Sequence, residues 1–174
     1  MTPPPRSLRV FAIYLGFLAL ALLVAPNLLL QKFTGPAFIA TTRLNLAPAA
    51  EGDQAGLIVF GSSYAWIGLR QTGKGPRLIL ATCENARDGA AEVEAAGLDL
   101  GRAAVHVRVS VDARARCRFA YSLDGLAFEA FGGEFQARQG RWIGAKVGLF
   151  ATGRTDAAQT GYAEFGQFRV TSNP

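Results

Sequence analysis

Acidic residues are the first place to look for catalysis in this chain of 174 residues. Two carboxylates held about 5 to 9.5 Å apart can act as acid and nucleophile or base in glycoside hydrolysis. The closest pair at alternate positions is Glu92 and Glu94, with Val93 between them. We interpret them as exposed charges on a strand, because no third acid follows at a matching spacing. The sequence therefore identifies no catalytic residue, and a hydrolase with an unrecognised carboxylate pair stays an alternative.

Aromatic rings offer a second kind of chemistry, because the face of a sugar ring stacks on an exposed aromatic face. The candidates for carbohydrate binding are Tyr64, Trp66, Trp142 and Tyr162, with Tyr121 as a further ring. Trp66 is favoured, since it follows the loop 61–63 and shares a strand face with Tyr64. The competing interpretation for each ring is a core position, because large aromatic side chains usually stabilise a fold by burial.

Basic residues form a third candidate, a cationic face made of His106, Arg108, Arg116 and Arg118. Alternation predicts that all of them point outward from one β-hairpin. Such a face keeps a sheet soluble and blocks edge pairing. The sharper hypothesis is contact with an acidic partner, either an anionic polysaccharide or membrane phosphates.

Metal and cofactor chemistry is not indicated, and we expect neither. Cys83, Cys117 and the single histidine fall short of a closed zinc site unless carboxylates assist. No dense run of aspartates predicts a calcium loop, and Asp53 and Asp124 fit turns instead. A disulfide between the two cysteines is left open, because sequence does not give their separation.

Short alternating strands carry these residues. We predict strands at 38–46, 55–60, 64–70, 77–82, 91–95, 105–111, 116–122, 128–131, 146–151 and 161–170. Glycine-rich turns separate them, and the only helical candidate, 86–96, fits a strand equally well. Many short strands at this spacing are typical of an all-β sandwich or barrel.

The clearest hairpin runs from Val105 to Ser122. Valines at alternate positions of its first strand would face the core, opposite the basic residues. Asp124 and Gly125 then favour a tight turn that returns the chain into Phe128.

The first 25 residues have a different character from the rest. Arg6 and Arg9 precede an uncharged apolar run, 10–25, which has the length of a signal-peptide core and is short for a membrane span. We assign 1–25 to a signal peptide or N-terminal membrane anchor and 26–174 to the domain. The protein is expected to be exported, periplasmic or secreted, with an inner-membrane anchor as the alternative, since cleavage after Ala25 is not settled.

The net charge of +5 does not by itself indicate a nucleic-acid partner. The basic residues lack zinc-finger spacing, an aromatic RNA-binding motif or a basic helix. We therefore expect no nucleic acid among the partners.

Five segments, taken together, resemble one family: 26–33, 55–59, 119–125, 140–150 and 161–165. They are similar to the C-terminal concanavalin A-like domain of the beta-xylosidases of glycoside hydrolase family 43. The resemblance covers about residues 26 to 174 and implies an all-β jelly-roll sandwich of two antiparallel sheets, which packs on a separate catalytic propeller. The family commonly ends in Gly-Tyr-Ala-Asp-Phe-Asp-Trp-Phe, from which this chain departs at Glu164, Gly166 and Gln167.

The resemblance implies a non-catalytic, carbohydrate-associated accessory domain without its propeller. Its expected partner is a polysaccharide or oligosaccharide of the xylan type, or a glycoside hydrolase on which it docks. Two alternatives stay open: a stand-alone hydrolase acting on xylan- or arabinan-type substrates, and a folded remnant without a ligand.

Overall fold

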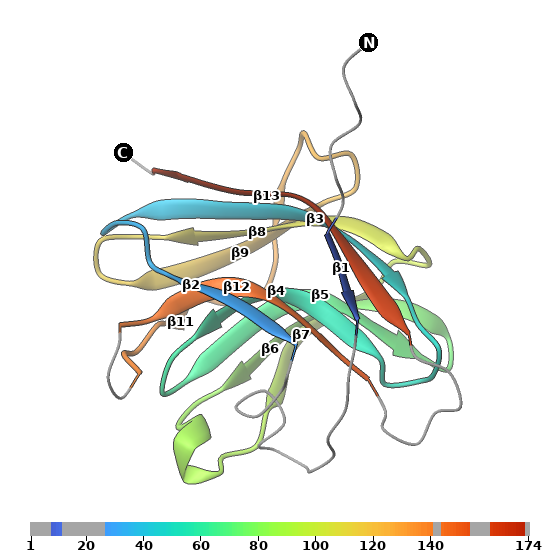
Figure 1. Ribbon diagram of the computed structural model, residues 1–174, viewed down its shortest axis with the longest axis horizontal. Coiled ribbons are helices and arrows are strands. Elements are labelled where there is room, and N and C mark those ends of the chain that lie inside the picture. Colours follow the sequence, from blue (N-terminus) through green and yellow to red (C-terminus); the bar gives the residue numbers. More distant parts are fainter. Residues whose placement is uncertain (1–7, 12–26, 141–143, 154–160, 173–174) are drawn as a thin grey trace.

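Two antiparallel sheets packed face to face make up the computed structural model (Figure 1). It describes residues 8–11, 27–140, 144–153 and 161–172. The all-β sandwich predicted from the sequence is confirmed.

Sheet A forms one layer, with the strand order β1-β13-β3-β8-β9-β10 and with β11 also paired to β9. Its strands are β1 (Leu8–Phe11), β3 (Phe38–Ala47), β8 (Ala104–Val111), β9 (Arg116–Ser122), β10 (Glu129–Ala130), β11 (Phe135–Gln136) and β13 (Tyr162–Ser172). Strands that are distant in sequence are neighbours here, because β3 pairs with β13 on one side and with β8 on the other.

Sheet B forms the other layer, in the order β2-β12-β4-β5-β6-β7. Its strands are β2 (Leu28–Lys32), β4 (Gln54–Phe60), β5 (Tyr64–Thr72), β6 (Gly75–Cys83), β7 (Val93–Asp99) and β12 (Lys146–Thr152). A single 3₁₀ turn, η1 (Ala86–Asp88), leads from β6 towards β7. The stretch 86–96 is therefore neither one helix nor one strand.

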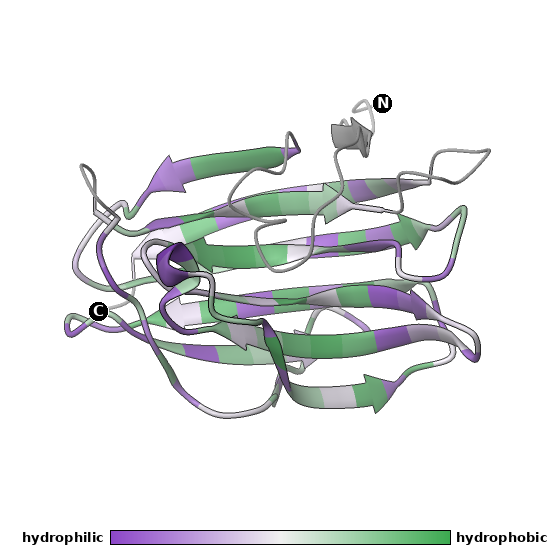
Figure 2. Ribbon diagram, turned by 90° about the horizontal axis from the view of Figure 1, so that it is seen from below, coloured by the Kyte–Doolittle hydropathy of each residue, from purple (hydrophilic) through white to green (hydrophobic). Residues whose placement is uncertain are grey.

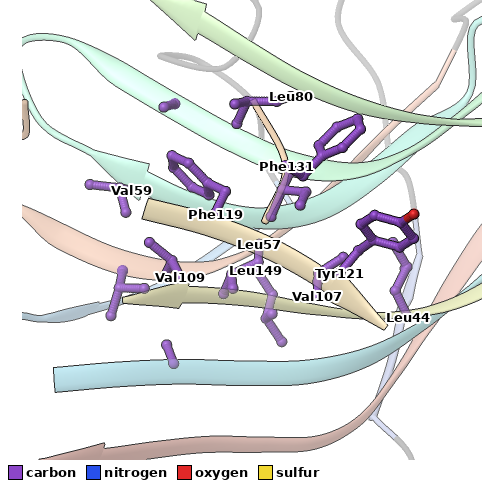
Figure 3. Packing of buried hydrophobic residues seen from close by; sticks show 14 of the residues in the cluster. Leu44, Leu57, Val59, Leu80, Val107, Val109, Phe119, Tyr121, Phe131 and Leu149 are labelled. Atoms are coloured by element: carbon purple, nitrogen blue, oxygen red, sulfur yellow. The ribbon is translucent and has the colours of Figure 1, made fainter. Parts of the chain in front are cut away.

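The main core lies between the sheets, where apolar side chains from both layers meet (Figure 3). Val107 and Val109 of β8 and Phe119 of β9 reach it from sheet A, and Leu57 of β4 and Leu149 of β12 reach it from sheet B. In β8 the alternate valines are buried, and the predicted hairpin with β9 is confirmed. Gly125 adopts a φ of 79°, which suits the Asp-Gly turn after β9.

The two sheets differ in how their outer faces are covered. Burial alternates along β3 and β8, so sheet A has one core face and one more polar face. In β4, β5 and β12 the buried residues run consecutively instead. Figure 2 shows the corresponding mixture of green apolar and purple polar segments along the strands. Strands with continuous apolar runs are buried on both faces, as these inner strands of sheet B are, whereas its edge strand β7 is largely exposed.

Segment 1–25 contains one described strand, β1, which pairs with residues 162–165 of β13. The prediction of a signal peptide or anchor in this segment stays a prediction. In the part of the chain that the structure describes, no helix has the length and apolar character needed to cross a membrane.

Candidate functional site

The two aromatic residues favoured by the sequence are not exposed. Trp66 has no exposed surface and Tyr64 is 2% exposed, both on the outer face of sheet B. They pack with Ile58 and Phe150 in a second apolar layer, and the Trp66 ring meets Phe150 edge-on. Their prediction as stacking platforms is wrong, because a buried ring cannot receive a sugar.

Glu92 explains why these polar aromatics can be buried. One oxygen of its carboxylate accepts hydrogen bonds from Trp66 Nε1 (2.8 Å) and from the Tyr64 hydroxyl (3.1 Å). The other accepts one from Arg70 (3.1 Å), whose guanidinium also lies 5.4 Å from the centroid of the Trp66 ring. Burial and the neighbouring carboxylate raise the pKa of Tyr64, so its hydroxyl stays protonated and donates. The Glu92 carboxylate and its three donors therefore satisfy one another's hydrogen bonds.

The acidic pair Glu92 and Glu94 is engaged in the same way. Glu94 bridges Arg70 and Arg77, at 3.6 and 3.2 Å. These carboxylates therefore hold the outer face of sheet B together. Glu94 is an exposed charge on β7, as predicted, whereas Glu92 lies just before that strand and is half-buried, which differs from the prediction.

The other two aromatic candidates have different outcomes. Tyr162 lies half-buried at the start of β13, opposite Ala47, and faces outward because its neighbour Ala163 is in the core. It stays a candidate for stacking. Trp142 lies outside the described residues.

The predicted cationic face belongs to the outer side of sheet A, with all its members outward from β8 and β9. Two of the four are held by acids: Arg116 pairs with Asp112 (2.7 Å) and Arg118 with Glu134 (2.9 Å). Arg108 lies over the ring of Phe128, 3.5 Å from its centroid. Only part of this face is therefore available for an acidic partner.

A hollow of about 530 Å³ lies next to this face and is the candidate site. That volume falls within the usual range for small-ligand sites. The polar side chains that line it are Arg43, Asn45, Arg102 and His106, and Leu123 of the β9–β10 turn contributes an apolar edge. This turn projects above sheet A (Figure 1).

Strand pairing explains how these residues meet. Arg43 of β3 lies directly opposite His106 of β8, and His106 lies opposite Ser122 of β9. On the other side Arg43 lies opposite Gly166 of β13. The result is one row of side chains across the sheet, with Gly166 adding no side chain at its end.

His106 is suited to bind neutral groups. Burial and the nearby Arg43 lower its pKa, and Asp124 opposes this shift. A neutral imidazole has one N–H donor and one acceptor nitrogen, so it can bind a hydroxyl group in either sense.

The end of the chain is irregular beside this row. The register of β13 shifts between Gly166 and Arg169, and Gln167 has a φ of 55°. A β-bulge of this kind bends a strand and redirects its side chains. Thr42 fixes the strand from below, since its hydroxyl donates to the Gly166 carbonyl (3.1 Å). The bulge falls at two of the positions where the sequence departs from the family ending.

The cysteines and the turn aspartates have structural roles. Cys83 and Cys117 are free and buried, and burial raises the pKa of Cys117 to about 12. Asp53 accepts from the N–H groups of Ala49 and Ala50, and Asp124 accepts from two N–H groups of its own turn. Among the described ranges, no group of three or more His, Cys, Asp or Glu side chains is arranged to hold a metal ion.

Comparison with known families accounts for this architecture. The model of the beta-xylosidase C-terminal concanavalin A-like domain matches residues 1–171. The chain belongs to this family. A comparison with curated proteins found no match.

Solved structures of glycoside hydrolase family 43 proteins have the same fold as this concanavalin A-like domain. A bifunctional protein from Bacteroides eggerthii superposes with a TM-score of 0.83 at 22% identity, over 97% of this chain and 21% of its own. BlXynB from Bacillus licheniformis gives 0.77 at 21% identity, over 96% of this chain and 33% of its own. A xylan beta-1,4-xylosidase from Bacillus halodurans gives 0.76 at 18% identity, over 95% and 33%. The chain thus spans about a fifth to a third of the length of these proteins.

Sequence reasoning missed Arg43, Asn45 and Arg102 as residues of the candidate site. The alternation of residues 38–46 placed Arg43 and Asn45 on the outward face, but gave no sign that this strand lies beside β8. Arg102 lies in the loop before β8, where no pattern marked it.

Proposed function

We propose that this concanavalin A-like domain is a non-catalytic accessory domain that binds a xylan-type glycan on the outer face of sheet A. The observation that carries the proposal is the hollow beside β3 and β8, in a domain of the beta-xylosidase family. Sheet A is favoured over sheet B because its outer face keeps polar groups within reach of solvent.

The hollow offers the groups that sugar hydroxyls need. Asn45 supplies both a carbonyl and an amide, and His106 supplies a donor and an acceptor. Tyr162 lies on the same face as Asn45 and close to it. Tyr162 of β13 is opposite Ala47 of β3, and Asn45, two residues before Ala47, is opposite Glu164 of β13. A ring next to hydrogen-bonding groups fits a glycan laid across the sheet.

Calorimetric titration of the full chain with xylohexaose tests this proposal. Binding without released sugar is the expected result, and Tyr162→Ala should weaken it several-fold because a stacking surface is lost. Thr171→Ala is the matched control, since it lies on the same strand and outer face beyond the bulge. Release of shorter sugars would contradict the non-catalytic role, and absence of binding would contradict the site.

Export belongs to the same proposal, because a xylan-type glycan is met outside the cytoplasm. The apolar run at 10–25 supports a leader or a membrane tether. Fractionation of cells, with the mass of the mature chain measured, distinguishes a cleaved leader from an anchor and from retention in the cytoplasm.

Docking on a glycoside hydrolase is the second candidate function. It is favoured by the length of the similar family 43 proteins, of which this chain covers 21% to 33%. Leu126 is 86% exposed and Leu123 is 48% exposed on the projecting β9–β10 turn, which gives a docking partner an apolar contact. Retention of a family 43 catalytic domain by the full chain, lost in Leu126→Ser, would favour this function over glycan binding.

A further inference from the structure

Arginines in this fold divide into those with an acidic partner and those without one. Arg70 and Arg77 are ion-paired across sheet B, and Arg116 and Arg118 are ion-paired at the far end of sheet A. Within the described residues, Arg43 and Arg102 have no such pair. Both are exposed, and both line the hollow.

No carboxylate of the residues that the structure describes lines the hollow to neutralise them. The acid that acts on His106 is Asp124, and its carboxylate already accepts from Ser122 Oγ (2.8 Å) and from two backbone N–H groups of the turn. Among the residues that line the hollow, these two guanidinium groups thus have no counter-charge. A ligand carboxylate is the partner that this arrangement lacks, since guanidinium groups bind carboxylates through paired N–H donors.

Gly166 keeps the far side of Arg43 open. It lies opposite Arg43 across the β13–β3 pair, and a Cβ built on it would be 3.9 Å from the Arg43 Cβ, which is ordinary contact. A side chain therefore fits there. An acidic one would bring a carboxylate next to Arg43, and the glycine leaves that place free.

We propose that the hollow binds a sugar carboxylate, so that the glycan recognised on sheet A carries uronic acid units. Arg43 and Arg102 bind the carboxylate, while Asn45 and His106 contact the neighbouring hydroxyls. The proposal rests on the proposed glycan-binding function and deepens it, because it names the chemical class that the site selects.

The test compares two ligands of equal length, a neutral xylo-oligosaccharide and one that carries a single glucuronic acid branch. The full chain is expected to bind the acidic ligand about tenfold more tightly, which is the size of one charge-assisted contact. Raising the salt from about 50 to 500 mM should reduce this preference, because salt screens exposed charges.

Gly166→Asp and Gly166→Asn form a matched pair of variants. The aspartate supplies Arg43 with an internal counter-charge and should remove most of the preference for the acidic ligand. The asparagine has nearly the same shape without the charge and should keep it. The melting temperatures of both variants are measured to check that the fold is intact.

Arg43→Gln and Arg114→Gln separate local from general charge effects. Arg43→Gln should lose the preference, whereas Arg114→Gln should retain it. Arg114 is an exposed residue of the β8–β9 turn, so its substitution by glutamine removes the same charge at a place outside the hollow.

The outcomes separate the two proposals. Equal binding of both ligands, unaffected by Gly166→Asp, would overturn the carboxylate site and leave the glycan-binding function in place. Binding of neither ligand would overturn the function itself. Binding to anionic lipid vesicles without binding to the acidic ligand would also overturn the sugar carboxylate, in favour of membrane phosphates.

Discussion

Both sheets carry arginines on their outer faces, but the arginines differ in whether they have an acidic partner. On sheet B, Trp66, Tyr64 and Arg70 all converge on Glu92 and are buried or half-buried. On sheet A, Arg43 and Arg102 are exposed beside a hollow and have no acidic partner among the described residues. Residue type alone would favour binding at the aromatic face, whereas the contacts are the reason for proposing it at the outer face of sheet A.

The difference shows a useful criterion for separating structural from binding residues: whether a polar side chain already has its hydrogen-bond or ion-pair partners within the protein. A polar group that already has its partners and is buried gains little from a ligand and loses much when a partner is removed. An exposed charge without a partner contributes little to folding and stays available for binding. The predictions below test this division.

The largest effect is expected for Trp66→Ala. Removal of a fully buried indole should lower the free energy of unfolding by about 3 to 5 kcal/mol, because it leaves a cavity beside Phe150. Urea denaturation measures this loss. Glycan affinity of the folded protein should be unchanged, and a stable variant that no longer binds glycan would return Trp66 to the list of stacking residues.

Glu92→Ala is expected to have an intermediate effect. The side chains of Trp66 and Tyr64 would keep their buried N–H and O–H donors but lose the acceptor that both share, at a cost of about 1 to 3 kcal/mol. The measurement is again urea denaturation. Glu84→Ala is the control, since Glu84 is exposed and lies 4.0 Å from its nearest cation, Arg138. Equal stability of the two variants would contradict a structural role for Glu92.

The smallest effect concerns pH and the single histidine of the chain. Burial and Arg43 lower the pKa of His106 below 6.5 in the folded state, against the opposing charge of Asp124. The unfolded chain therefore binds more protons just below pH 6.5, so this group makes stability fall as the pH falls through that window. Denaturation at pH 7.5 and pH 5.5 should show a smaller difference in His106→Gln than in the native chain. An unchanged difference would indicate that His106 is not held neutral.

Alternation was enough to predict an all-β fold, and the family resemblance then indicated the sandwich. The valines of β8 and the aromatic residues of β9 share one face, and the Asp-Gly turn follows, so the hairpin could be predicted without any long-range information. The strand at 64–70 was also recognised, with Tyr64 and Trp66 correctly placed on the same side.

The site could not be predicted to the same extent, because its residues come from strands that are distant in sequence. Period-two alternation says which way Arg43 points, but not that β3 lies between β13 and β8. It also cannot tell whether an outward face is covered, and this is why Trp66 was misjudged. The partner of Trp66 was visible as Glu92, 26 residues further on, but nothing local connects them.

Strand β1 bears on how accessible the edge of sheet A is to a second chain. It occupies the outer edge of sheet A and covers the first part of β13, which is 11 residues long. A processing cut after Ala25 would remove this cover and leave backbone N–H and C=O groups of β13 without a neighbour. An exposed strand edge invites pairing with a second chain. The bulge at Gly166 and Gln167 would then keep this edge irregular, which disfavours pairing with a second chain.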